Sequence, residues 1–76
     1  MTESHRAVLC IRNDGYPVSL EVRKVYRALP DPLGESRGFL RVVDESGESY
    51  LYPKHLFATI ELPREAIELL NASGVW

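Results

Sequence analysis

The stretch 39–62, FLRVVDESGESYLYPKHLFATIEL, decides the fold. It begins with the apolar run Phe39–Val43, continues through the polar loop 44–48 and returns through the residues 49–52. Two such runs joined by a short loop are typical of a β-hairpin, and Gly47 can take the left-handed backbone conformation that the loop requires. The sequence therefore predicts two antiparallel strands here.

The end of this stretch predicts how the chain leaves the hairpin. Pro53 ends the second strand, because proline has no N–H to donate to a sheet. Residues 54–57 are too few for anything but a 3₁₀ turn, and Ala58–Leu62 is predicted as the last strand. The hairpin is thus expected to lead through a tight turn into one more strand.

A short helix is predicted near residues 63–72. Pro63 suits the first turn of a helix, and Ile67 and Leu70 are spaced to share one face. Gly74 is a suitable terminator. A helix of about two turns does not persist alone, so this one is expected to dock on its own domain or on a partner.

The segment before residue 18 predicts the first strand. Ala7–Ile11 is a short apolar run with β-branched members, and Asn13-Asp14-Gly15 after it is a strong turn signal. Because the run is too short for a typical helix, it is interpreted as a buried strand. Cys10 alternates with Val8 in this run, which favours a buried side chain over a reactive thiol.

Residues 18–29 alternate between apolar and polar side chains, but the alternation changes phase at Arg23-Lys24. A slip of one residue turns side chains to the other face of a sheet, so a bulge or sharp bend is implied there. The segment is predicted as two short strands on either side of Arg23-Lys24, or one bent strand, ending at Pro30. The loop 30–38 follows, and its two prolines and two glycines predict no regular structure.

Composition limits the size and class of the molecule. With 76 residues, the chain is expected to form one domain over 1–76, with 1–6 as a flexible leader. A hydrophobic fraction of 45% is too high for a disordered chain. Cys10 is the single cysteine, so an intrachain disulfide is impossible, and no metal or cofactor site is predicted. Self-association remains open as a source of stability.

Charge and hydropathy bear on partners and location. The formal net charge is −2, whereas a dedicated nucleic-acid binder usually carries a basic excess. No apolar run approaches the roughly 18 residues that cross a membrane, and the start lacks the apolar core of a signal peptide. With one unpaired thiol, a cytoplasmic location without membrane contact is expected.

Three segments, in this order, resemble an SH3 domain. Leu20–Leu29 resembles the passage from the diverging turn into the second strand, Phe39–Val42 resembles the opening of the third strand, and Tyr52–Phe57 resembles the proline and 3₁₀ turn that close the barrel. Through Asp44–Pro53 the chain also resembles small bacterial proteins of unknown function built on this barrel. The resemblance, over roughly 7–62, implies a five-stranded SH3-like β-barrel.

The differences from peptide-binding SH3 domains bear on function. Ile11 and Asn13 stand at or near the positions of the first-strand tyrosines, Leu56 stands where the 3₁₀ tyrosine would be, and Phe39 replaces the tryptophan. The loop 13–17 is also far shorter than the one that walls the peptide groove. Recognition of proline-rich ligands is therefore not expected, and the barrel is treated as a scaffold.

No catalytic arrangement is predicted. His5 and His55 are both interpreted as surface side chains, and no serine, histidine and aspartate are spaced as a triad. The acidic residues near Gly47 lack the ligand pattern of a calcium loop. We therefore expect a non-enzymatic module that binds an unknown protein partner or forms a homodimer.

The predicted interaction surface has an aromatic and a basic part. Exposed aromatic side chains that form one patch are a candidate protein interface, and the helix face of Ile67 and Leu70, with Val75 and Trp76, is a candidate dimer contact. A basic face with nearby aromatics is the alternative, a barrel that binds nucleic acid. The residues are Tyr16, Phe39 and Tyr50, and Arg23, Lys24, Arg27, Arg37 and Arg41.

Overall fold

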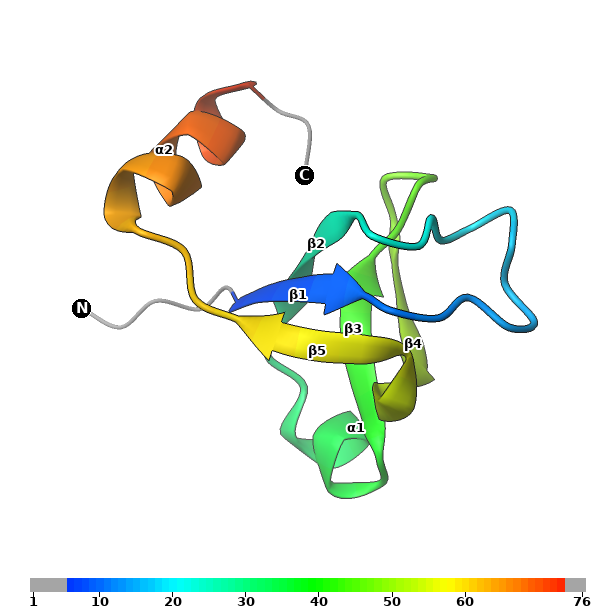
Figure 1. Ribbon diagram of the computed structural model, residues 1–76. Coiled ribbons are helices and arrows are strands. Elements are labelled where there is room, and N and C mark those ends of the chain that lie inside the picture. The colour runs from blue at the N-terminus through cyan, green and yellow to red at the C-terminus, as the bar shows by residue number, and fades with distance from the viewer. Residues whose placement is uncertain (1–5, 74–76) are drawn as a thin grey trace.

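The computed structural model describes residues 6–73, and they form one antiparallel five-stranded sheet (Figure 1). The strand order is β4-β3-β2-β1-β5, so β5 returns beside β1 at the edge opposite β4. Because β4 and β5 are not paired with each other, the sheet is not closed. In chain order the elements are β1 Arg6–Cys10, β2 Val25–Leu29, α1 Pro32–Ser36, β3 Phe39–Val43, β4 Ser49–Pro53, the 3₁₀ turn η1 Lys54–Leu56, β5 Phe57–Ile60 and α2 Arg64–Ser73.

The predicted hairpin is confirmed. Phe39 pairs with Pro53 and Val43 with Ser49, so β3 and β4 face each other along their whole length. Gly47 has φ +84° at the tip of the loop, which is the left-handed conformation expected of it. The predicted 3₁₀ turn, final strand and C-terminal helix are also present, within two residues of the expected limits.

Each strand places at least one side chain in a common core, and β2 and β3 do so at alternate positions. Leu40 and Val42 of β3 are buried while Arg41 between them is not, and Val8 and Cys10 of β1 are fully buried. Fully burying a valine or leucine side chain contributes about 1.5–3 kcal/mol, so a few such residues decide the stability of a domain this small. The core comprises Val8, Cys10, Leu20, Tyr26, Ala28, Leu40, Val42, Tyr52, Leu56 and Phe57.

The prediction of a strand at 18–22 is wrong. These residues form turns, Val18 is 89% exposed and Leu20 alone is buried, with 1% exposed. The N–H groups of Ser19 and Leu20 donate to the carbonyl of Tyr16, so the backbone bonds locally instead of to a neighbouring strand. Of the three alternating apolar residues Val18, Leu20 and Val22, only Leu20 enters the core, where it anchors a long loop. The predicted bend is confirmed, since Arg23 has φ +76°.

The prediction that 30–38 lacks regular structure is also wrong, because α1 lies within it. Asp31 caps this helix, with its carboxylate accepting from the N–H of Gly34 at 3.0 Å, and Pro32 occupies the first turn, where its missing N–H costs nothing. Gly34 lets α1 lie close to β4, since a Cβ there would stand 2.7 Å from Cδ2 of Leu51. The same proline and glycine that suggested a loop therefore allow the helix.

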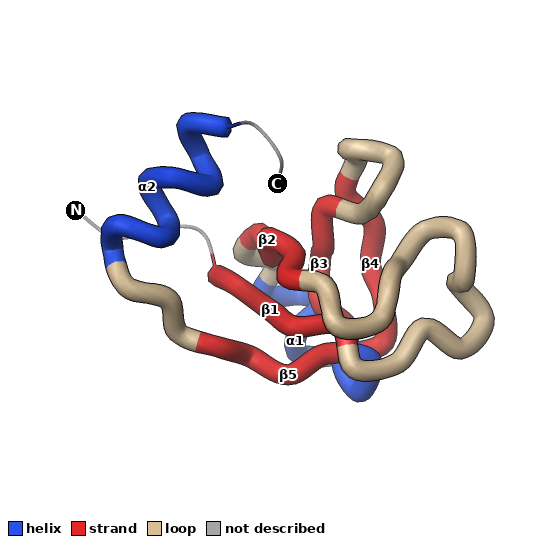
Figure 2. The backbone as a smooth tube through the Cα atoms, turned by 45° about the horizontal axis from the view of Figure 1, so that its top comes forward, coloured by secondary structure: helices blue, strands red, loops and turns tan. Residues whose placement is uncertain are grey.

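The described part of the chain begins with β1 and ends with α2. Arg6, expected in the leader, is the first residue of β1, while His5, Gly74, Val75 and Trp76 lie outside the described residues. Figure 2 shows α2 joined to β5 by an extended segment and set apart from the strands. Ile67 and Leu70 are half-buried, as a shared helix face predicts.

Candidate functional site

A long loop, 11–24, and the hairpin loop 44–48 are fastened to one another. The N–H of Glu45 donates to the carbonyl of Ser19 at 3.0 Å, which joins the two loops directly. Asn13 Nδ2 donates to the carbonyl of Leu20 at 3.0 Å and holds the long loop against itself. Together with the buried Leu20, these bonds keep the loop in a fixed position beside β4.

Between the two loops lies a cleft of about 460 Å³, which we call the tyrosine cleft. The ring of Tyr16 packs edge-on against Tyr52, with ring centroids 4.9 Å apart and an interplanar angle of 82°. Tyr52 is buried, whereas Tyr16 is 36% and Tyr50 50% exposed. The cleft is lined by Tyr16, Ser19, Asp44, Ser46, Tyr50, Leu51 and Tyr52.

Asp44 forms the polar floor of the tyrosine cleft. It is only 6% exposed, and its Oδ1 accepts from the N–H of Ser46 at 2.8 Å and from the Ser46 hydroxyl at 2.5 Å. Its Oδ2 accepts from the hydroxyl of Tyr52 at 2.5 Å. Burial raises the pKa of this carboxyl, but the hydrogen bonds from Ser46 and Tyr52 outweigh burial, so its pKa is lowered. Burial and the bond to Asp44 raise the pKa of Tyr52 to about 12.

This arrangement suits binding better than proton transfer. Both oxygens of Asp44 are already occupied by donors from its own chain, so the carboxylate is poorly placed to accept a proton from a substrate. The exposed hydroxyl of Tyr50 donates to Glu48 at 2.9 Å. What the cleft offers a ligand is two aromatic faces and the polar edges of Ser19 and Ser46.

A second carboxylate, that of Glu45, binds Lys24, one of the basic residues predicted to form the interaction surface. Glu45 Oε2 accepts from Lys24 Nζ at 2.7 Å and from the hydroxyl of Tyr26 at 2.5 Å. The bond from Lys24, followed by that from Tyr26, lowers the pKa of Glu45. Burial, and next the bond to Glu45, raises the pKa of Tyr26. Lys24 is therefore a partner of the hairpin loop.

The aromatic residues predicted to form an interface do not all meet. On the hairpin, Tyr50 lies opposite Val42, on the face that carries the core. Phe39 lies opposite Pro53, at the alternate register position, so its side chain is on the other face of the sheet. Tyr16 and Tyr50 share the tyrosine cleft, and Phe39, 37% exposed, is outside it.

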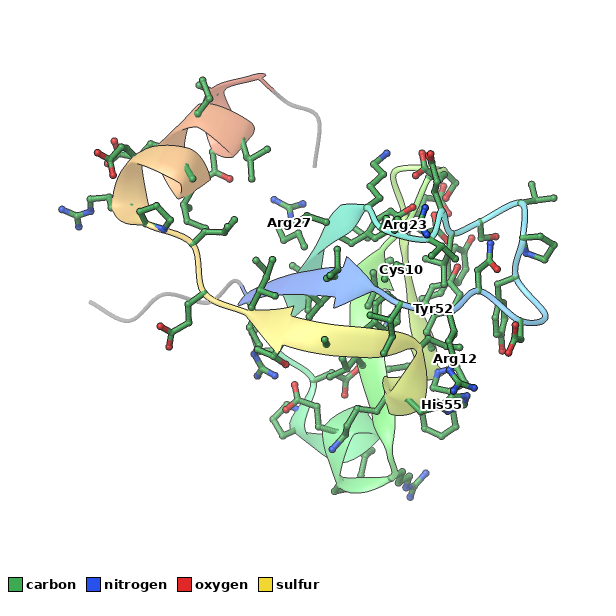
Figure 3. All side chains as sticks on the ribbon, viewed as in Figure 1. Cys10, Arg12, Arg23, Arg27, Tyr52 and His55 are labelled. Carbon is green, nitrogen blue, oxygen red and sulfur yellow. The ribbon has the colours of Figure 1, made fainter. Side chains whose placement is uncertain are left out.

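The five predicted basic residues are distributed over several elements. Arg41 on β3 donates from Nε to Asp31 Oδ2 at 2.8 Å, and this bond follows that from Gly34 in lowering the pKa of Asp31. Arg37 is exposed at the end of α1. Figure 3 shows Arg27 beside β2 on the side of α2, whereas Arg23 lies on the 11–24 loop. Arg41 lies opposite Leu29, two residues along β2 from Arg27, so Arg27 and Arg41 lie on the same face of the sheet, whereas Lys24 is bound to Glu45.

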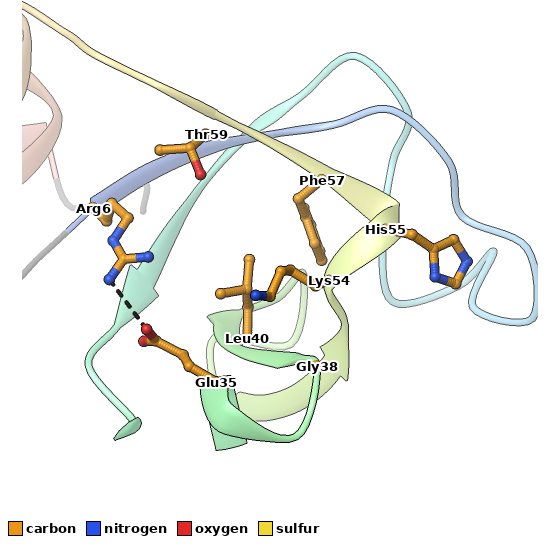
Figure 4. Close-up of a pocket in the computed structure, with 8 residues that line it drawn as sticks. All are labelled: Arg6, Glu35, Gly38, Leu40, Lys54, His55, Phe57 and Thr59. Atoms are coloured by element: carbon orange, nitrogen blue, oxygen red, sulfur yellow. Dashed lines mark hydrogen bonds and ion pairs between the residues drawn. The ribbon is translucent and has the colours of Figure 1, made fainter. Parts of the chain in front are cut away.

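A second cleft, of about 550 Å³, lies beside η1 (Figure 4). Lys54 and Arg6 supply its positive charge, and Arg6 pairs with Glu35 at 3.5 Å. Leu40 and Phe57 supply apolar surface. The sequence interpretation placed Lys54 in the 3₁₀ turn 54–57 and assigned it no role. No local signal marks this cleft, because β1, α1, β3, η1 and β5 each contribute to it.

Comparisons of the chain with protein-family models, with curated proteins and with solved structures found no match. Within residues 6–73, no group of three histidine, cysteine or acidic side chains is placed to hold a metal ion. Among the described helices, none has the length and apolar character needed to cross a membrane. The candidate site therefore rests on the geometry of the two clefts alone.

Proposed function

We propose that this chain is an SH3-like barrel that acts as a non-catalytic protein-interaction module and that it holds an extended peptide in the tyrosine cleft. The order of the strands supports the fold, since β5 follows a 3₁₀ turn and pairs with β1. The observation that carries the function is the exposure of Tyr16 and Tyr50 on either side of one concave site. Aromatic side chains contribute a large contact area at low cost in conformational entropy.

The fixed position of the cleft walls supports the proposal further. Tyr16 belongs to a loop that the Glu45–Ser19 bond and the burial of Leu20 hold in place. A ligand would not have to order this loop on binding, which keeps the entropic cost of association low. The basic residues give less support to a nucleic-acid-binding barrel, because Lys24 and Arg41 already pair with Glu45 and Asp31.

Selection from a phage-displayed library of random linear peptides tests the proposal. We expect enriched sequences to bind the wild-type protein as synthetic peptides and to lose most of their affinity for Tyr50→Ala. Phe39→Ala is the matched control, because Phe39 is similarly exposed but lies on the other face of the sheet. Failure to enrich any peptide, or equal binding by both variants, contradicts the proposed site. Size-exclusion chromatography over a range of concentrations distinguishes self-association from partner binding.

A further inference from the structure

The cleft in Figure 4 lies beside β5, whose outer edge pairs with no strand among residues 6–73, and we call it the edge cleft. Phe57 and Thr59 line it from β5, at alternate positions of the strand. The side chain of Thr59 is exposed, and β5 is the end strand of the sheet, so among residues 6–73 no strand pairs with its outer edge. The remaining lining residues are Arg6, Glu35, Gly38, Leu40, Lys54 and His55.

The register shows which backbone groups this edge presents. The N–H of Ile11 donates to the carbonyl of Leu56, and the pairing of β1 with β5 continues in the same register. Hydrogen-bonded and non-hydrogen-bonded pairs alternate in an antiparallel ladder, so Ala58 and Ile60 bond to β1. Phe57 and Thr59 therefore direct their backbone groups away from β1, toward the free edge.

These outward groups are almost all unpaired. Among residues 6–73, no hydrogen bond uses the N–H or carbonyl of Thr59, or the carbonyl of Phe57. The N–H of Phe57 is the exception, because it donates to the carbonyl of Lys54 within η1. An extended segment placed along β5 would thus find one donor and two acceptors, and the ladder would stop at η1.

Two basic side chains, Arg6 and Lys54, line the edge cleft, and Lys54 lies in η1, where the ladder would stop. The guanidinium of Arg6 pairs with Glu35 at 3.5 Å, but no described acidic side chain lies within 4.0 Å of Lys54 Nζ. In Figure 4 the side chain of Lys54 extends toward Leu40 and the interior of the cleft, whereas His55 points away. The edge cleft therefore combines apolar surface with an ammonium that has no acidic partner among residues 6–73, in a protein whose net charge is −2.

We propose that the edge cleft binds the free C-terminus of an extended peptide, which adds to β5 as an antiparallel strand. In this orientation the end of the peptide lies at Phe57, next to Lys54. The N–H of the last peptide residue donates to the carbonyl of Phe57, and the residue two positions earlier exchanges both its backbone bonds with Thr59. Because the N–H of Phe57 is already used, the terminal carboxylate is left to bind Lys54.

The same register sets the side-chain preference. Peptide residues opposite Phe57 and Thr59 place their side chains on the face that carries Phe57 and Leu40. The last and third-last residues of the ligand should therefore be apolar, and the residue between them points to solvent. This site shares no lining residue with the tyrosine cleft, so it goes beyond the function proposed above.

Fluorescence anisotropy with one labelled peptide in several forms tests the proposal. The probe is fluorescein-Gly-Ser-Ser-Val-Ser-Val with a free C-terminus, and its counterparts carry a C-terminal amide, an N-methyl group on the last backbone nitrogen, or serine in place of both valines. We expect saturable binding of the free acid, about fivefold weaker binding of the amide for one partly exposed charge pair, and no binding of the N-methylated form.

Protein variants assign the effect to the site. Lys54→Gln should abolish the difference between acid and amide, while Arg64→Gln, an exposed cation on α2, should preserve it. Thr59→Pro should lose binding but retain the fold by circular dichroism, because its N–H faces the free edge. Tyr50→Ala should bind the free acid as the wild type does, which separates this site from the tyrosine cleft.

Three results would each overturn the proposal. The first is the absence of saturable binding of the free acid up to about 1 mM peptide. The second is equal affinity of the acid and the amide for the wild-type protein. The third is a Lys54→Gln variant that still discriminates between them.

Discussion

Replacing Tyr52 by phenylalanine removes one hydroxyl group from the interior and nothing else. That hydroxyl donates to Asp44 Oδ2 at 2.5 Å, and Asp44 is 6% exposed. A hydrogen bond to a charged group is worth about 1.5–3 kcal/mol, and we take about 2 kcal/mol because Ser46 continues to satisfy the other carboxylate oxygen. For a domain of this size, about 2 kcal/mol corresponds to a fall in Tm of roughly 8–16 °C.

Tyr50→Phe is the matched control for this measurement. Tyr50 stands two residues earlier on the same strand and donates to Glu48 at 2.9 Å, but both groups are exposed. Water replaces the lost partner there, so the variant should have the same Tm as the wild type. Circular dichroism melts at pH 7 and urea titrations of the three proteins give the comparison.

The dependence on pH provides a second check of the same bond. The pKa of Asp44 is lowered by folding, so its contribution is present above the ordinary value of 3.8 and is lost as the pH falls through the lower folded value. The stability difference between wild type and Tyr52→Phe should therefore narrow below about pH 3.8. The pKa of Tyr52 is raised from 10.0 to about 12, so the stability that its neutral hydroxyl contributes should be lost as the pH rises from 10.0 toward 12.

The reasoning fails if Tyr52→Phe melts no lower than Tyr50→Phe. It also fails if the difference from the wild type is the same at pH 3 and at pH 7, because the bond would then owe nothing to the charge of Asp44.

Two further predictions concern the long loop and the thiol. Leu20→Ala should lower the free energy of unfolding by about 2–5 kcal/mol, whereas Val18→Ala, at a site 89% exposed, should leave it unchanged. Equal effects of the two variants in urea titrations would refute the view that Leu20 alone anchors the loop. Cys10 is fully buried and burial raises its pKa, so its reaction with iodoacetamide at pH 8 should be slow in the native protein and fast in urea; rapid native labelling would show that β1 opens readily.

Sequence patterns predicted the parts of the fold that depend on neighbouring residues. The hairpin 39–53, the η1 turn after Pro53 and the helix after Pro63 each carry a local signal, and each is present. The two errors have different causes. Leu20 enters a core built by all five strands, which no local pattern shows, whereas the Asp31 cap and Pro32 that begin α1 are a local signal that the interpretation of 30–38 as a loop passed over.

The clefts were predictable to a smaller extent, because residues distant in the sequence form them. Tyr16 and Tyr50 could be named as exposed aromatics from the sequence, but their meeting depends on the Glu45–Ser19 bond between two loops. Phe39 was grouped with them because its face could not be assigned without the register. Lys54 became a candidate only when the outward backbone groups of β5 were known.

The fastening of the 11–24 loop at its base has a practical consequence for engineering. The N–H of Arg23 donates to the carbonyl of Cys10 at 2.7 Å, the carbonyl of Ser19 accepts from Glu45, and Leu20 is buried. The sheet therefore does not depend on the residues at the tip of the loop. At the tip, Asp14 and Gly15 are exposed and contribute no buried contact. Exposed turns of this kind tolerate inserted chain well, which makes the Asp14–Gly15 bond a position where a foreign peptide could be displayed without rebuilding the domain.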